Sequence, residues 1–74
     1  MNNYMNLLEC MQWAAGNGFT ITIHHNDEKV VAEIDDDKEI LPICAYEYEF
    51  GSDSNFEKEL ATILSDLFFE RESK

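Results

Sequence analysis

The chain has 74 residues, 45% of them apolar and 12% aromatic, so we expect residues 1–74 to form one folded domain with one core. Its 16 Asp and Glu residues outnumber its 5 Lys and Arg residues, which gives a formal net charge of −11. A surface of this sign repels nucleic acid and anionic membranes and attracts basic proteins, which argues against direct DNA or RNA binding.

The chain shows no apolar run near the roughly 20 residues of a membrane-spanning helix, and no basic start followed by an apolar core. We therefore expect a cytoplasmic protein. Cys10 and Cys44 could pair, but they fall in different expected elements and their spacing indicates no disulfide framework. Reduced thiols buried in the core are the interpretation that fits this compartment.

The first helix is expected to begin at Asn2 or Asn3, because an Asn side chain accepts hydrogen bonds from the free amides of a first helical turn. Apolar side chains then recur at the period of one helical face: Tyr4, Leu7, Leu8, Met11 and Ala15. Residues 16–18 end the helix, since Gly takes the left-handed conformation at a helix end without steric penalty.

Trp13 falls on the side of this helix opposite the apolar stripe, beside Asn6 and Glu9, when each residue advances about 100°. Two explanations remain open for a Trp in that position. A loop or the other helix covers it, or it is an anchor of a protein interface, where exposed Trp is enriched.

Three β-strands are expected in the middle of the chain, over residues 19–25, 29–35 and 40–50. Each alternates its side chains with period two, and polar, acidic segments between them supply turn residues. Pro42 cannot donate a hydrogen bond to a neighbouring strand, so it marks the start of the third strand or a sheet edge. The side chains expected on the apolar faces are Phe19, Ile21, Ile23, Val30, Ala32, Ile34, Cys44, Tyr46, Tyr48 and Phe50.

The last helix is expected to begin at Ser54, which forms the S-x-x-E capping box with Glu57. Phe68 flanks its apolar stripe, and Phe69 points away from it. The stripe itself consists of Phe56, Leu60, Ile63, Leu64 and Leu67. Short loops between sequential elements predict an α+β domain of order α-β-β-β-α. Its sheet is a three-stranded antiparallel meander, with both helices packed on one face.

No motif for catalysis, a cofactor or a metal is present. A calcium-binding EF-hand loop that starts at Asp35 would need Gly and Glu where the chain has Ile40 and Tyr46. His24 and His25 are neighbours on a strand and point to opposite faces, so they cannot chelate one metal together. The acidic residues fall on strands and turns that face water, in a chain too short for a deep pocket. We therefore expect no enzyme activity, no cofactor and no bound metal.

The order α-β-β-β-α at this length resembles the double-stranded-RNA-binding domain, a family with the same order of elements. That family grips phosphates with a basic cluster at the start of its last helix and with a His-bearing loop between its first two strands. Here the corresponding helix start, residues 55–59, is net acidic, and only His24 and His25 lie near the other position. The resemblance implies the topology, while the reversed charge argues against RNA binding.

The negative charge is concentrated on the expected sheet and its turns, because residues 26–51 hold nine acidic and two basic residues. Carboxylates at i and i+2 on a strand lie roughly 7 Å apart, and neighbouring strands lie roughly 4.8 Å apart. Each DNA strand presents one phosphate per roughly 3.4 Å, so such a face imitates a nucleic-acid backbone. Thr20 and Thr22 would add neutral hydrogen bonds on the same face. The carboxylates expected to face Lys or Arg of a partner are Glu33, Asp35, Asp36, Asp37, Glu39, Glu47 and Glu49.

These observations lead to the hypothesis of a small inhibitor that mimics nucleic acid and occupies the basic DNA- or RNA-binding site of an enzyme. In size and charge the chain is similar to phage proteins that block CRISPR effectors or restriction enzymes. An acidic surface that serves solubility alone is the plain alternative. The rival class is a non-catalytic homodimer or adaptor module, joined through Trp13, Phe69 or the edge strand that contains Pro42.

Overall fold

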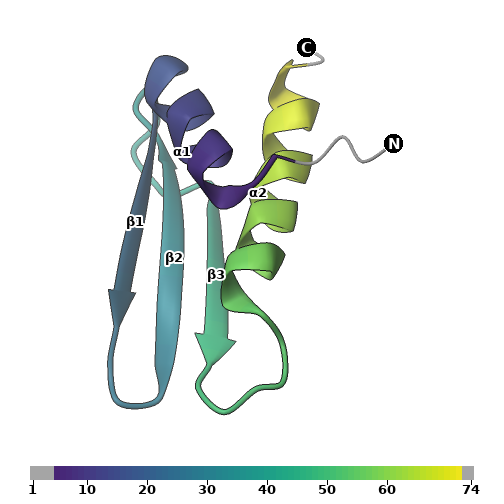
Figure 1. Ribbon diagram of the computed structural model, residues 1–74. Coiled ribbons are helices and arrows are strands. Elements are labelled where there is room, and N and C mark those ends of the chain that lie inside the picture. The colour runs from purple at the N-terminus through teal and green to yellow at the C-terminus, as the bar shows by residue number, and fades with distance from the viewer. Residues whose placement is uncertain (1–4, 73–74) are drawn as a thin grey trace.

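The computed structural model describes residues 5–72 and confirms an α+β fold of order α-β-β-β-α (Figure 1). The strands form one antiparallel sheet in the order β1-β2-β3, and the helices pack against it. The elements are α1 (Leu7–Gly16), β1 (Phe19–His25), β2 (Lys29–Asp36), β3 (Cys44–Glu49) and α2 (Phe56–Glu72).

The hydrophobic core lies between the two helices and one face of the sheet. Ala32 and Ile34 are alternate residues of β2, and both are fully buried, as the period-two pattern predicted. Both helices contribute buried side chains to the same cluster: Cys10, Ala14, Leu60, Leu64 and Phe68.

The third strand is shorter than predicted. The ladder between β2 and β3 ends at the pair Ile34 and Cys44, and residues 40–43 form a loop instead of strand. Ile40 is 98% exposed and Leu41 is 74% exposed. The physical reason is that β2 has only two residues left beyond Ile34, and Pro42 has no N–H to donate to a ladder.

Phe50 was predicted to face the core, and this prediction is wrong. It lies in the turn after β3 and is 51% exposed. Its backbone N–H donates to the carbonyl oxygen of Glu28 at 3.0 Å, which closes the end of the sheet. The backbone then turns away at Gly51, whose φ of +89° lies in the left-handed region that favours glycine.

Helix α1 begins later than the sequence suggested. Its N-cap is Asn6, whereas Asn2, Asn3 and Tyr4 lie outside the described residues. The Asn6 side chain accepts a hydrogen bond from the Glu9 N–H at 2.8 Å, and the Glu9 carboxylate accepts one from the Asn6 N–H at 2.9 Å. This reciprocal pair is a capping box, in which each side chain satisfies an amide of the first turn. The helix ends at Gly16, as predicted.

The apolar stripe predicted for α1 faces water over most of its length. Leu8 is 64% exposed, Met11 is 37% exposed, and Ala15 is also exposed. The buried residues of this helix are Cys10 and Ala14. The predicted orientation of α1 is therefore wrong for these residues, although Leu7 packs against the core, and the helix docks mainly through the side that carries Cys10, Trp13 and Ala14.

Close approach of the two helices explains this orientation. The Cys10 thiol lies 3.7 Å from both the backbone oxygen of Ala61 and the hydroxyl of Ser65 on α2. Cys10, Ala61 and Ser65 are small residues, so the two helices approach closely at this point. Burial raises the pKa of the Cys10 thiol, although its contact with Ser65 opposes that rise.

Trp13 packs against the core. Of the two explanations for its position, coverage by the other helix is therefore the correct one. Its ring stacks on Phe68 of α2 at 4.4 Å between centroids and on Phe19 of β1 at 5.6 Å. Such stacked aromatic pairs add stability beyond the area that they bury.

Helix α2 is capped by Asn55, one residue later than predicted. The Asn55 side chain accepts a hydrogen bond from the Lys58 N–H at 3.0 Å, so the capping box predicted at Ser54 is wrong. Phe68 was predicted at the margin of the apolar stripe, yet it is fully buried and is the largest such side chain. Leu60 and Leu64 of the predicted stripe are fully buried, as expected.

Candidate protein-binding face of the sheet

The face of the sheet that points away from the helices is polar and acidic. In an antiparallel sheet, residues paired across strands point to the same face, so the register assigns each side chain. One row across this face joins Thr22, Glu33 and Ala45, and it alternates with rows whose side chains enter the core. We call this surface the free face, and its residues are Thr20, Thr22, His24, Lys29, Val31, Glu33, Asp35, Ala45, Glu47 and Glu49.

The free face brings together four of the seven predicted partner-binding acids. Glu33 and Asp35 project from β2, and Glu47 and Glu49 project from the adjacent β3. The carboxylates occupy alternate residues of neighbouring strands, which is the arrangement that the sequence pattern predicted.

One cation on the free face, Lys29, offsets part of this charge, and a histidine lies beside a second acid. The Lys29 ammonium lies 2.8 Å from a Glu47 carboxylate oxygen, and His24 Nε2 lies 3.6 Å from a Glu33 carboxylate oxygen. The hydrogen bond to Glu47 raises the pKa of Lys29, which keeps that amine charged. Among residues 5–72, neither Asp35 nor Glu49 takes part in an ion pair. The free face therefore keeps a net negative charge.

Asp36 was expected on the partner-binding surface, but the structure places it on the opposite side of the sheet. It pairs with Phe19 at the end of β1, and its side chain is only 15% exposed. One carboxylate oxygen accepts a hydrogen bond from the Lys38 N–H at 3.0 Å, and the other lies 3.7 Å from Arg71 of α2. Its contacts are with the protein's own turn and helix.

Asp37 and Glu39 lie in the loop between β2 and β3, at one end of the free face. The Asp37 carboxylate accepts a hydrogen bond from the Thr20 hydroxyl at 3.1 Å, and its N–H donates to the Gly18 carbonyl at 2.9 Å. The Glu39 N–H donates to the Asp36 carbonyl at 2.8 Å, which closes a turn. These bonds hold the start of the loop against the sheet.

The same loop exposes Ile40 and Leu41, which sequence reasoning assigned to a strand. Two neighbouring aliphatic side chains in water beside acidic residues form a mixed surface. The signal that could have found them is Pro42, because a proline directly after two apolar residues opposes their inclusion in a ladder.

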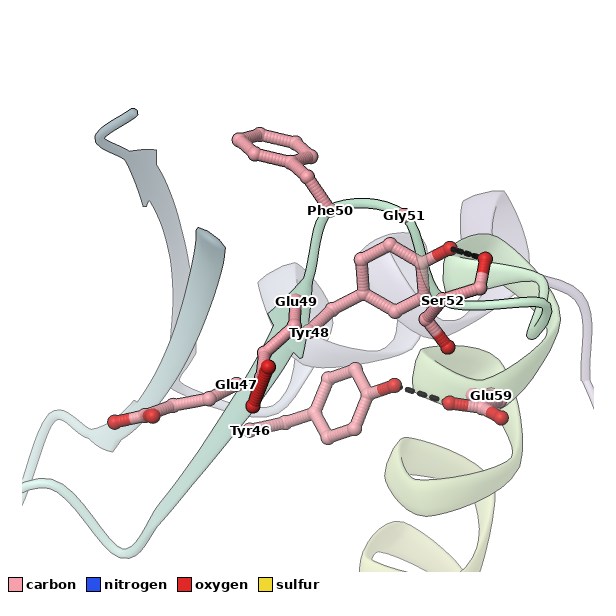
Figure 2. Close-up of a pocket in the computed structure, with 8 residues that line it drawn as sticks. All are labelled: Tyr46, Glu47, Tyr48, Glu49, Phe50, Gly51, Ser52 and Glu59. Atoms are coloured by element: carbon pink, nitrogen blue, oxygen red, sulfur yellow. Dashed lines mark hydrogen bonds between the residues drawn. The ribbon is translucent and has the colours of Figure 1, made fainter. Parts of the chain in front are cut away.

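A shallow hollow lies beside β3, where the start of α2 approaches the sheet (Figure 2). Tyr46 and Tyr48 point from the strand toward α2, whereas Glu47 points to the opposite side. The Tyr48 hydroxyl donates to the Ser54 carbonyl at 2.6 Å, and the Tyr46 hydroxyl donates to the Glu59 carboxylate. The hollow is therefore crossed by contacts that fasten α2 to the sheet.

The pair formed by Tyr46 and Glu59 has shifted ionisation. Burial raises the pKa of Tyr46 to about 12, and its bond to Glu59 adds to that rise. The same bond lowers the pKa of Glu59, with help from the Ser54 hydroxyl. At neutral pH the phenol is a donor and the carboxylate an acceptor, which suits a structural contact.

The remaining candidate residues are dispersed. His24 and His25 belong to opposite faces, as predicted. Across the part of the chain that the structure describes, no group of three or more His, Cys, Asp or Glu side chains is arranged to hold a metal ion. Cys10 is buried and Cys44 is half-buried, and both thiols are free. Phe69 is half-buried on α2.

Within residues 5–72, no helix is both long enough and apolar enough to cross a membrane. The chain matches no protein-family model, no curated protein and no solved structure. The function must therefore be argued from the free face and the loop beside it.

Proposed function

We propose that this protein is a small non-catalytic inhibitor that binds the basic nucleic-acid-binding site of an enzyme through its free face. The observation that carries the proposal is the uncovered sheet face on which Glu33, Asp35, Glu47 and Glu49 lie on adjacent strands. Phage proteins directed against CRISPR effectors or restriction enzymes are the class that fits best, and they act in the cytoplasm.

The spacing of the carboxylates supports mimicry of a nucleic-acid backbone. Acids two residues apart on one strand are separated by roughly 7 Å, about the distance spanned by two phosphate steps of a DNA strand. Because the sheet fixes these positions before binding, the side chains alone lose freedom when Lys or Arg residues of the target approach. Thr20 and Thr22 add neutral hydroxyls on the same face.

The loop beside the free face adds an apolar contact to this surface. Ile40 and Leu41 are exposed next to Glu39, and hydrogen bonds of Asp37 and Glu39 hold the start of the loop. A target with an apolar depression beside its basic groove would bury both side chains, at about 25 cal/mol per Å² of apolar area. The complex would then resist salt better than a purely ionic one.

A DNA-displacement assay tests the proposal. Restriction endonucleases and RNA-guided nucleases are loaded with fluorescein-labelled duplex DNA, and this protein is added while fluorescence anisotropy is recorded. We expect the protein to displace DNA from at least one enzyme, with weaker displacement as salt concentration rises.

Matched charge variants decide whether the free face is responsible. Glu47→Gln with Glu49→Gln removes two carboxylates from the free face, and Asp66→Asn with Glu70→Gln removes two exposed ones from α2. The first pair should raise the concentration needed for half displacement about tenfold or more, and the second should change it little. Equal effects of the two pairs would show that only net charge matters, and the proposal would then fail.

A further inference from the structure

The outer edge of β1 has backbone groups that no other strand of the described residues pairs with. β1 is the first strand in the order β1-β2-β3, so within residues 5–72 one of its sides has no neighbouring strand. The Asn26 N–H donates to the Lys29 carbonyl, and the Asp37 N–H donates to the Gly18 carbonyl. These two bonds fix which residues of β1 hydrogen-bond to β2, because bonded and non-bonded pairs alternate along an antiparallel ladder. Even-numbered residues of β1 therefore bond to β2, and the amides of Ile21 and Ile23 point outward.

β1 itself has no Asp, Glu, Lys or Arg residue, in contrast to β2 and β3. β1 reads FTITIHH, with no acidic or basic residue besides its histidines. At the other edge, Glu47 and Glu49 alternate along β3 beside the outward-pointing amides. Charged side chains on an edge strand normally prevent pairing with another chain, so β1 lacks the protection that β3 has.

Exposed apolar side chains of α1 adjoin the same edge. Met11 and Ala15 line a hollow together with Phe19, Thr20 and Ile21 of β1. Ile23, farther along the strand, is 41% exposed. Apolar side chains of α1 and β1 therefore meet at this edge, and the polar residues Thr20 and Asp37 line the same hollow.

We propose that two copies of this chain dimerise by pairing their β1 strands antiparallel, edge to edge. In the register that pairs the whole strand, Thr22 lies opposite Thr22 of the second copy, and Ile21 lies opposite Ile23. The outward amides then exchange hydrogen bonds, the threonines meet on one face, and Ile23 is covered on the other. Met11 and Ala15 of each α1 face the second copy across the joined strands.

The distribution of charge favours a second copy of this chain as the partner at the β1 edge. A chain with net charge −11 repels itself at most surfaces, and β1 is the strand without acids of its own, with Asp37 beside Thr20 near one end. In the dimer the two β2 strands, which carry Glu33 and Asp35, are three strand spacings or roughly 14 Å apart. That separation exceeds the Debye length of about 8 Å at physiological ionic strength, so the acids of the two copies are largely screened.

The pairing also sets the relation between the free faces. A two-fold axis through the Thr22 pair stands perpendicular to the sheet, so both free faces lie on one side and all helices on the other. The dimer would present a single acidic surface twice as wide. Dimerisation does not depend on the proposed inhibitor function, and the two respond to salt in opposite directions.

Sedimentation equilibrium over protein concentrations up to millimolar tests the dimer. We expect the mass to rise from 8.6 kDa toward twice that value as concentration increases. Added salt should favour the dimer, because it screens the remaining repulsion. A mass that stays at 8.6 kDa throughout would overturn the proposal.

Two matched variants locate the contact. Ile23→Pro removes an outward amide from β1, and Ala45→Pro removes an outward amide from β3, while neither amide serves the internal ladder. Circular dichroism checks that each variant folds. The first should make the protein monomeric and the second should leave the dimer unchanged, whereas the reverse pattern would place the contact at β3 and refute the β1 pairing.

A third variant keeps the test decisive if either proline prevents folding. Met11→Glu adds a carboxylate beside the β1 edge on an exposed side chain, and Lys58→Gln, at an exposed position of α2, is a control that lowers the net charge by the same amount elsewhere. Met11→Glu should weaken dimerisation at least tenfold, and retention of the wild-type association constant would count against the proposed edge.

Discussion

The two faces of β2 have opposite environments within a few residues of the same strand. Ala32 and Ile34 point into the core and are fully buried, whereas Glu33 and Asp35 point to the free face and stay accessible to water. Because successive side chains of a strand point to opposite faces, β2 places its core residues on one face and its acids on the other. Substitution of acids on the free face should therefore leave the protein folded, whereas substitution of core residues should destabilise it.

Phe68→Ala is expected to have the largest effect on stability. Phe68 is fully buried and contacts both Trp13 and Phe19, so its removal leaves a cavity that costs about 3–5 kcal/mol. A domain of this size has a total stability of about 4–11 kcal/mol, so the variant would be largely or partly unfolded. Urea denaturation followed by circular dichroism measures the loss. A loss below about 1 kcal/mol would contradict the central place of this ring in the core.

Asp36→Ala and Asp35→Ala compare adjacent acids on opposite faces. Asp36→Ala removes the acceptor for the Lys38 N–H and the partner of Arg71, and we expect a loss of about 1 kcal/mol. Asp35 makes no such contact, so Asp35→Ala should change stability by less than about 0.5 kcal/mol. Thermal unfolding of both variants in the same buffer tests the difference. Equal losses would show that Asp36 is not held by the fold as described.

Tyr46→Phe should destabilise the protein in a pH-dependent way. The lowered pKa of Glu59 contributes stability above the ordinary carboxyl pKa, and this contribution is lost as pH falls through the folded value. The raised pKa of Tyr46, about 12, contributes stability that is complete below the ordinary phenol pKa of 10.0 and is lost above it. Urea titrations at several pH values should therefore show the largest difference from wild type near neutral pH. A difference independent of pH would exclude the hydrogen bond as its cause.

Glu33→Gln should have the smallest effect on stability. The side chain is partly exposed, and its contact with His24 at 3.6 Å lies at the surface and is an ion pair only when the imidazole is protonated. Such pairs contribute about 0–1 kcal/mol, so the midpoint of urea unfolding should stay close to that of wild type. Glu70→Gln, at an exposed position of α2, is the matched control. A large loss from Glu33→Gln alone would mean that the free face supports the fold after all.

The sequence predicted the parts of the fold that depend on local pattern. The strict alternation of Phe19–His25 gave β1 with its correct bounds, and the buried pair Ala32 and Ile34 followed from the same period. The prediction of which side of α1 faces the core failed, because more than one side of that helix carries apolar residues. In α1, Leu8 and Met11 lie at helical spacing like a core stripe, yet they are exposed.

The face on which each candidate acid lies was predicted correctly for some residues and wrongly for others. Alternation along β2 and β3 correctly grouped Glu33 with Asp35 and Glu47 with Glu49. Asp36 was grouped with them for a different reason, because the acidic run at residues 36–39 was predicted to form a turn that faces water. The strand extends through Asp36, and the next position along a strand points to the other face, so this acid meets Arg71 instead.

The sequence by itself determined the element order, the alternation of the strands and the concentration of acids on the sheet. Those features depend on each residue and its near neighbours. The tertiary structure decided which side of α1 enters the core, because two sides of that helix carry apolar residues and the side with Cys10, Trp13 and Ala14 is the one that meets α2. It also decided that Trp13 packs on Phe68 and that no other strand among residues 5–72 pairs with the outer edge of β1, since both depend on which segments distant in sequence lie side by side.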